Sequence, residues 1–237
     1  MRSCANRESR NVTNHLYKNE MTNLKMLAVW LSRIGHCRGF GVQSPSAYAF
    51  IRYVINEHYP YYAYDDMLKA WPDIKGLRLK LCRLYFRLAN FAQAQQWAWC
   101  GTLPEAEKQH ICRGCHNTKV ETTQASQPSQ SAMLSAIHAN ATVGIVSLSA
   151  TEDERQTFAE QFVSAKACNR DNGNALASAG NEEKTMLIIE GIGHDTTAKA
   201  IWQKLVNDRR VGITFDLYYC GIAFFDKRFK QNYIVNF

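Results

Sequence analysis

The hydrophobic pattern near the start of the chain predicts two helices. Apolar residues recur at helical spacing over residues 22–34, and Gly35 interrupts the pattern directly after them. In the next segment, Ser44 stands where a helix cap is expected and Pro45 where the first helical residue is expected, and apolar residues continue at helical spacing up to Ile55. A helical N-terminal region is therefore expected.

A third helix, amphipathic and basic, is predicted over residues 77–91. Leucines recur along one stripe of it, while Lys80, Arg83 and Arg87 lie along another. Residues 1–90 hold 14 Lys and Arg against 6 Asp and Glu, so they carry the positive charge of the chain. The basic stripe is either a solvated helix face or a surface for an anionic partner such as nucleic acid, although no recognisable nucleic-acid-binding module accompanies it.

Beyond residue 90 short apolar runs alternate with helical patterns. This alternation favours an α/β fold with a parallel sheet and crossover helices. The C-terminal segment is rich in β-branched and aromatic residues without a helix between them, and antiparallel strands are expected there to close the sheet. The predicted strands cover residues 96–101, 118–123, 142–149 and 185–191 and parts of 211–237, and the predicted helices cover 151–165 and 196–206.

Length and composition bound the class of protein. A chain of 237 residues that is 46% hydrophobic can close a substantial core, which excludes disordered and small disulfide-stapled classes. No window approaches the roughly 18 consecutive apolar residues of a membrane-spanning helix. The first twenty residues lack the apolar stretch of a secretory signal, so a cytoplasmic location is expected, with the eight cysteines as reduced thiols.

Three segments of the chain resemble a known family. They read GFGVQSPSAYAFIRYVINEHYPYY, LCRLYFRLANF and RRVGITFDLYYCGIAFFDKRFKQNYIVNF. Over about residues 24–237 the chain is similar to class I S-adenosylmethionine-dependent methyltransferases of an O-methyltransferase-like group common in Bacteroidetes. The resemblance implies a three-layer Rossmann-like sheet with an antiparallel C-terminal hairpin and an N-terminal helical cap. It also implies methyl transfer from S-adenosylmethionine to an oxygen of a small-molecule substrate.

The resemblance also implies a division of the chain. Residues 1–21 would be a tail, either disordered or assigned from too early a start codon, since Met21 opens the better-patterned segment. Residues 22–76 would form the helical cap, and residues 77–237 the methyltransferase-like α/β domain.

The cofactor site implied by the resemblance lies after the first predicted strand. Gly101 and Thr102 match the glycine-rich turn that would hold the methionine end of the cofactor. Trp99 stands where the family has an acidic residue, and Glu105 stands where it has a second glycine. The residue expected to hold the ribose hydroxyls is Gln124; its alternative, if the register slips, is Glu121.

Glu190 and His194 are the candidate catalytic residues. Glu190 corresponds to one member of an acidic pair in the family, and Gly191 stands at the other position. His194 and Asp195 follow at the end of the same predicted strand, where they would serve as a base and its orienting group. In the alternative interpretation, Asp195 caps the next helix and His194 is exposed.

Two other classes of function remain open. Residues 99, 105 and 124 differ from the pattern of the family, and a non-catalytic binding or scaffold protein on the methyltransferase fold would explain these differences. Metal or haem binding is suggested by the CxxCH string of Cys112, Cys115 and His116, which Cys100 and His110 would complete as a zinc site.

The aromatic and acidic segment HYPYYAYDD, residues 58–66, admits two interpretations. It would either cover a substrate pocket or pack at a domain junction, and packing is the prediction adopted because aromatic side chains that follow a helix are usually buried.

Overall fold

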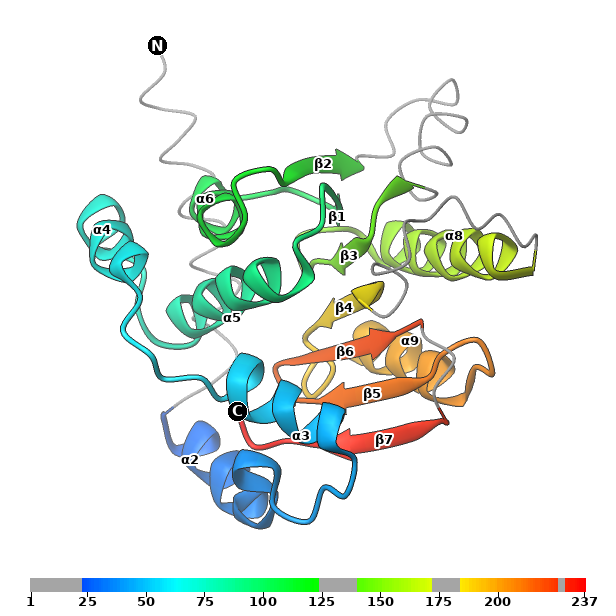
Figure 1. The fold of residues 1–237 in the computed structure, drawn as a ribbon, viewed down its shortest axis with the longest axis horizontal. Coiled ribbons are helices and arrows are strands. Elements are labelled where there is room, and N and C mark those ends of the chain that lie inside the picture. Colours follow the sequence, from blue (N-terminus) through cyan, green and yellow to red (C-terminus); the bar gives the residue numbers. More distant parts are fainter. Residues whose placement is uncertain (1–22, 124–139, 172–183, 226–228) are drawn as a thin grey trace. The chain divides into compact units, whose positions relative to one another are not determined.

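The structure is a computed structural model whose described residues are 23–123, 140–171, 184–225 and 229–237 (Figure 1). The predicted tail, residues 1–21, lies outside them. The described chain forms two compact units. The first contains the residues up to Phe91 together with Pro104–His116 and Val235–Phe237, and the second contains Ala92–Leu103 and Asn117–Ile234. This grouping differs from the predicted division at residue 76, because the helix over residues 77–91 packs within the first unit.

The first unit is helical. Ser44 is the N-cap residue of α3, as predicted: its Oγ accepts a hydrogen bond from the amide of Ala47, and Pro45 is the first helical residue. The predicted helices near residues 22–34, 45–55 and 77–91 are confirmed. The elements are α2 (Asn23–Ser32), the 3₁₀ helix η1 (Ile34–Gly39), α3 (Pro45–Phe50), the π-helical turn η2 (Ile51–Ile55), α4 (Tyr62–Ala70), α5 (Gly76–Ala92) and α6 (Glu105–Gly114).

A buried ion pair joins α5 to α6. Arg78 donates from Nε to Glu107 Oε1 at 2.7 Å and from Nη2 to Glu107 Oε2 at 3.0 Å. Both side chains are almost fully buried, so each charge depends on the other for its compensation. The end of α6 also approaches α5 closely, because a Cβ at Gly114 would overlap the main-chain oxygen of Phe86. These contacts explain why both helices belong to the first unit.

The predicted basic stripe of α5 is only partly at the surface. Arg87 is buried and donates from Nε to the carbonyl of Val54 at 2.6 Å, from Nη2 to that of Ile55 at 2.9 Å and from Nη1 to the Tyr64 hydroxyl at 3.3 Å. It therefore satisfies the carbonyls at the end of η2. The interpretation of Arg87 as part of a nucleic-acid-binding surface is wrong, because its guanidinium is hydrogen-bonded to main-chain and side-chain oxygens inside the unit.

The second unit is built on one seven-stranded sheet with the order β2-β1-β3-β4-β6-β5-β7. β1 pairs in parallel with β2 and β3, and β3 pairs in parallel with β4; β6 runs antiparallel to both β4 and β5. The protein is thus an α/β protein with a mixed sheet. The strands are β1 (Gln96–Cys100), β2 (Lys119–Thr123), β3 (Val143–Val146), β4 (Met186–Glu190), β5 (Ile213–Asp216), β6 (Cys220–Phe224) and β7 (Gln231–Ile234).

The antiparallel pairing expected for the C-terminal strands holds for β5 and β6 and is wrong for β7. β7 pairs in parallel with β5, with Ile213 opposite Gln231 and Asp216 opposite Ile234, and is not antiparallel. β6 already has β4 on one side and β5 on the other, so the last strand does not pair with it. The last strand joins instead at the other edge of β5, at one end of the sheet (Figure 1).

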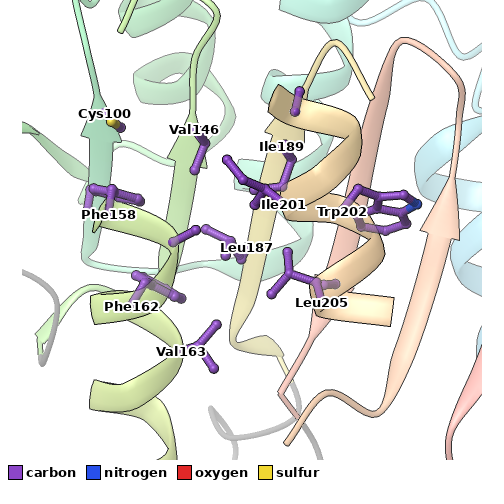
Figure 2. Close-up of a cluster of buried hydrophobic side chains, with 14 of the residues drawn as sticks. Cys100, Val146, Phe158, Phe162, Val163, Leu187, Ile189, Ile201, Trp202 and Leu205 are labelled. Carbon is purple, nitrogen blue, oxygen red and sulfur yellow. The ribbon is translucent and has the colours of Figure 1, made fainter. Parts of the chain in front are cut away.

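Two helices, α8 (Glu152–Asp171) and α9 (Thr196–Asn207), pack on one face of the sheet. Figure 2 shows Phe158 and Phe162 from α8 and Ile201 and Trp202 from α9 gathered with strand residues such as Leu187. These side chains form one buried cluster, which provides the main hydrophobic stabilisation of the unit.

Alternate residues of β1 point to the two faces of the sheet. Ala98 and Cys100 belong to the cluster under α8 and α9, whereas Trp97 and Trp99 lie on the other face and are also fully buried. The strand is therefore apolar on both sides, as its continuous apolar sequence indicates. Among the residues that the structure describes, none of the helices has the length and apolar character needed to cross a bilayer.

Close packing in the centre of the sheet predicts a sensitive glycine. A Cβ at Gly221 would lie 2.5 Å from the ring of Trp202, so Gly221→Ala is expected to destabilise the protein by about 1–3 kcal/mol through overpacking. Gly35→Ala is the matched control, because no atom lies within 4 Å of a Cβ there. Urea unfolding measures both variants. Equal midpoints for the two would contradict the packing described here.

Candidate functional site

The strand order reverses at β1, and this reversal is the topological switch point of the parallel strands. β1 lies between β2 and β3, so the chain leaves β1 toward one side and later returns to its other side. Open α/β sheets bind ligands outside the carboxyl ends of their strands at such a switch point. The candidate site therefore consists of the loops after β1 and β3, with the loop after β4 next to them. Gly101, Thr102 and His194 lie in these loops, and Glu190 is the last residue of β4.

The loops after β1 and β3 are joined by a side chain. Ser149 Oγ accepts a hydrogen bond from the amide of Thr102 at 3.0 Å and donates to the carbonyl of the same residue at 3.1 Å. Gly101 has φ +97°, and a Cβ there would lie 2.7 Å from Ser149 Oγ and 2.8 Å from the amide nitrogen of Ala150. Glycine is thus required at residue 101 because the β3 loop packs against its main chain.

Trp99 closes the same turn from within the sheet. Its side chain is buried, and its Nε1 donates a hydrogen bond to the carbonyl of Thr102 at 3.2 Å. Both main-chain groups of Thr102 therefore have partners inside the protein. Trp99 thus holds the turn through its indole nitrogen.

Glu190 is buried at the end of β4, only 1% exposed. Its Oε2 accepts a hydrogen bond from the amide of Leu148 at 3.1 Å. The side chain of Leu148 in turn packs on Gly191, where a Cβ would lie 2.7 Å from it. The carboxylate therefore supports the β3 loop, and its burial separates it from a substrate in solution.

Asp195 is a helix cap and an ion-pair partner. Its Oδ1 accepts hydrogen bonds from the amide of Ala198 at 2.7 Å and from Nη1 of the buried Arg155 at 2.8 Å. The helix-cap interpretation of Asp195 is confirmed. His194 lies beside it half-buried, not exposed, and its amide donates to the carbonyl of Gly191. The side chain of Asp195 bonds Ala198 and Arg155, so it does not orient the imidazole of His194 as a base would require.

The turn between β5 and β6 holds the loop after β4. The carbonyl of Tyr218 accepts from the amide of Gly193 at 2.8 Å, and the carbonyl of Tyr219 accepts from the amide of Gly191 at 2.7 Å. Tyr218 has φ +70°, which is rare for a bulky residue, and its own amide donates to Asp216 Oδ1. The sequence reasoning missed Tyr218 and Ser149. Neither residue belongs to a motif, so the sequence carries no local signal for them.

Gln124, the predicted ribose partner, lies outside the described residues. Its alternative, Glu121, is on β2 opposite Ala98 of β1 and is partly buried. The structure therefore places Glu121 along the strand, before its carboxyl end.

The CxxCH string lies at the end of α6. Cys112 is half-buried, Cys115 is buried and His116 is exposed. Within the described ranges, no three His, Cys, Asp or Glu side chains group as a metal ion would need. Burial raises the pKa of the Cys112 thiol, and burial also raises the pKa of Cys100 to about 12, so both thiols are protonated at neutral pH.

His110 occupies an apolar site on α6. Its Nδ1 lies 2.7 Å from the carbonyl of Ala106, one turn earlier, and its ring lies near that of Trp71. Burial lowers the pKa of His110, which keeps the imidazole neutral with its proton on Nδ1. Its Nε2 is buried and has no hydrogen-bond partner, so the residue serves the packing of α6.

Each unit contains a cavity. One of about 620 Å³ is in the first unit, and its lining includes Tyr59, Tyr61 and Tyr64 from the aromatic segment of residues 58–66. The other, of about 360 Å³, lies between α8 and α9. Neither is lined by the predicted site residues. The aromatic segment was interpreted as packing, and Tyr64 is buried as expected, but the segment also borders a cavity.

No family model matches the chain, and no curated protein matches its sequence.

The buried imidazole makes stability depend on pH. Because the pKa of His110 is lower in the folded than in the unfolded protein, the unfolded state takes up more protons as the pH falls below about 6.5. The stabilisation that the neutral ring provides is full above that pH and is lost as the pH falls. We expect His110→Gln to flatten the decline in unfolding free energy between pH 7 and pH 5. His116→Gln, which changes an exposed neighbour, should leave the decline unchanged. Identical pH profiles for the wild type and His110→Gln would contradict this account.

Proposed function

We propose that the protein is a non-catalytic binding protein whose α/β sheet has the methyltransferase-type architecture. The parallel strands β2, β1, β3 and β4 followed by the antiparallel pair of β5 and β6 support this architecture. So does the burial of both faces of β1, which a three-layer arrangement requires. The helical first unit agrees with an N-terminal helical cap.

The hydrogen bonds of Ser149 to Thr102 carry the proposal. A nucleoside cofactor at a switch point needs free main-chain amides and open space beside the first glycine. Here the amide and the carbonyl of Thr102 are both bonded to Ser149, and Ser149 and Ala150 fill the space beside Gly101. These residues do not fit S-adenosylmethionine.

The carboxylates near the strand ends also have structural partners. Glu190 bonds the amide of Leu148, and Asp195 bonds Ala198 and Arg155. A general base must reach the proton that it removes, and in this structure the Glu190 and Asp195 carboxylates are instead bonded to main-chain amides. This supports binding without catalysis. Methyl transfer from S-adenosylmethionine to a small-molecule oxygen through Glu190 or His194 is the alternative, and the test below separates the two.

Titration calorimetry with S-adenosylmethionine and with S-adenosylhomocysteine, each up to about 1 mM, tests the proposal. We expect no saturable heat from either, because the strand-end loops are bonded to each other. A methyl-transfer assay with labelled cofactor should likewise show no transfer above background.

Saturable binding of either compound with a Kd below about 100 µM would contradict the proposal. The position of such binding is decided by Gly101→Ala, which would abolish it if it occurs at the strand ends. Gly35→Ala, the matched control, would leave it unchanged.

A further inference from the structure

The cavity of the first unit has the size and walls of a small-molecule site. Its volume of about 620 Å³ falls within the range of ligand pockets in proteins. One wall is a face of α5, and another is the segment between η2 and α4. Aromatic side chains line much of it, and these are Trp30, Tyr59, Tyr61, Tyr64 and Phe237.

Two arginines one turn apart on α5 line the cavity and differ in their surroundings. Arg87 uses all three of its nitrogens in hydrogen bonds to Val54, Ile55 and Tyr64. Arg83 is half-buried and stands over the ring of Tyr64, with its guanidinium carbon 4.8 Å from the ring centre. Its Nε has no hydrogen-bond acceptor, and within the described part of the chain no carboxylate pairs with it. Arg83 is thus a partly buried cation whose charge is compensated only by an aromatic ring.

Asn56 is a second polar residue in the lining of the same cavity. Its side-chain nitrogen is buried and has no hydrogen-bond partner among the described residues. Buried donors without acceptors are rare in folded proteins because each loses its hydration without replacement. Arg83 and Asn56 both line the cavity, so a ligand bound there lies beside both side chains, and the terminal nitrogens of Arg83 are placed to donate to an acceptor on it.

The chemistry of that acceptor follows from the lining. A guanidinium presents nitrogens in a planar fork that matches the two oxygens of a carboxylate. Three cations, Lys80, Arg83 and Arg87, line the cavity together with the two carboxylates of Glu57 and Asp65, so one negative charge on a ligand balances the lining and the second charge of a phosphate exceeds it. The aromatic walls favour a flat apolar group beside the charge. We infer that this cavity binds a small organic carboxylate that carries a flat ring.

This inference rests on the proposed binding function, for which it supplies a ligand class, but it concerns different residues. S-adenosylmethionine binding at the strand ends would overturn the proposed function and leave the cavity unaffected. Failure of the cavity to bind a carboxylate would overturn only the inference.

The test is titration calorimetry of the full chain with sodium benzoate, with benzamide as a neutral probe of the same shape and with inorganic phosphate. We expect benzoate to bind with a Kd of about 1 mM or lower. Benzamide and phosphate should each bind at least about tenfold more weakly, since one lacks the charge and the other the ring.

Variants locate the binding. Arg83→Gln is expected to weaken benzoate binding at least about tenfold, because it removes the charged fork. Arg52→Gln, the same change at an exposed arginine of η2 that does not line the cavity, should leave the Kd within about twofold. Asn56→Asp keeps the shape of the side chain and adds a negative charge, so it should also weaken binding about tenfold, and it tests the site if Arg83→Gln does not fold.

Several results would overturn the inference. These are no binding of benzoate up to about 10 mM, equal binding of benzamide or of phosphate, and a benzoate Kd that folded Arg83→Gln or Asn56→Asp leaves unchanged.

Discussion

The hydroxyl of Ser149 holds together the two loops on which the second unit's candidate site depends. It bonds both main-chain groups of Thr102, and it fixes the left-handed turn at Gly101 because no larger residue fits beside it. At a switch point the partners of such main-chain groups come either from a ligand or from the protein itself. In this protein they come from the protein.

The same rule extends along the carboxyl edge of the sheet. Glu190 fixes the amide of Leu148, Asp195 joins α9 to Arg155, and the carbonyl of Tyr218 holds Gly193. Each bond stabilises the fold and at the same time occupies a group that a cofactor or substrate would otherwise use. In the first unit the situation is reversed, because Arg83 and Asn56 line a cavity with buried donors that lack acceptors. The proposed ligand site therefore lies at this cavity and not at the strand ends.

Local signals in the sequence predicted much of the fold. The helix cap at Ser44 and the buried strand at residues 186–190 depend on neighbouring residues and on hydrophobic pattern, and both were predicted. The parallel pairing of β7 with β5 was not predicted, because the partner of the last strand depends on which edge of the sheet remains free. The burial of Arg87 was missed for a similar reason, since its acceptors lie about thirty residues earlier in the chain. The site residues were proposed from the resemblance alone. The hydrogen bonds of Thr102 to Ser149 and of Glu190 to Leu148 could not be predicted, because they join residues more than forty positions apart in the sequence.

Hydrogen exchange of two amides tests most directly whether the loops at the switch point are hydrogen-bonded to each other in the protein without a cofactor. The amide of Thr102 is bonded to Ser149 and that of Leu148 to Glu190. The account predicts that both exchange slowly in the free protein and that saturating S-adenosylhomocysteine does not change their rates. Rapid exchange of both amides that slows when S-adenosylhomocysteine is added would contradict it, because it would show loops that are open until a cofactor binds.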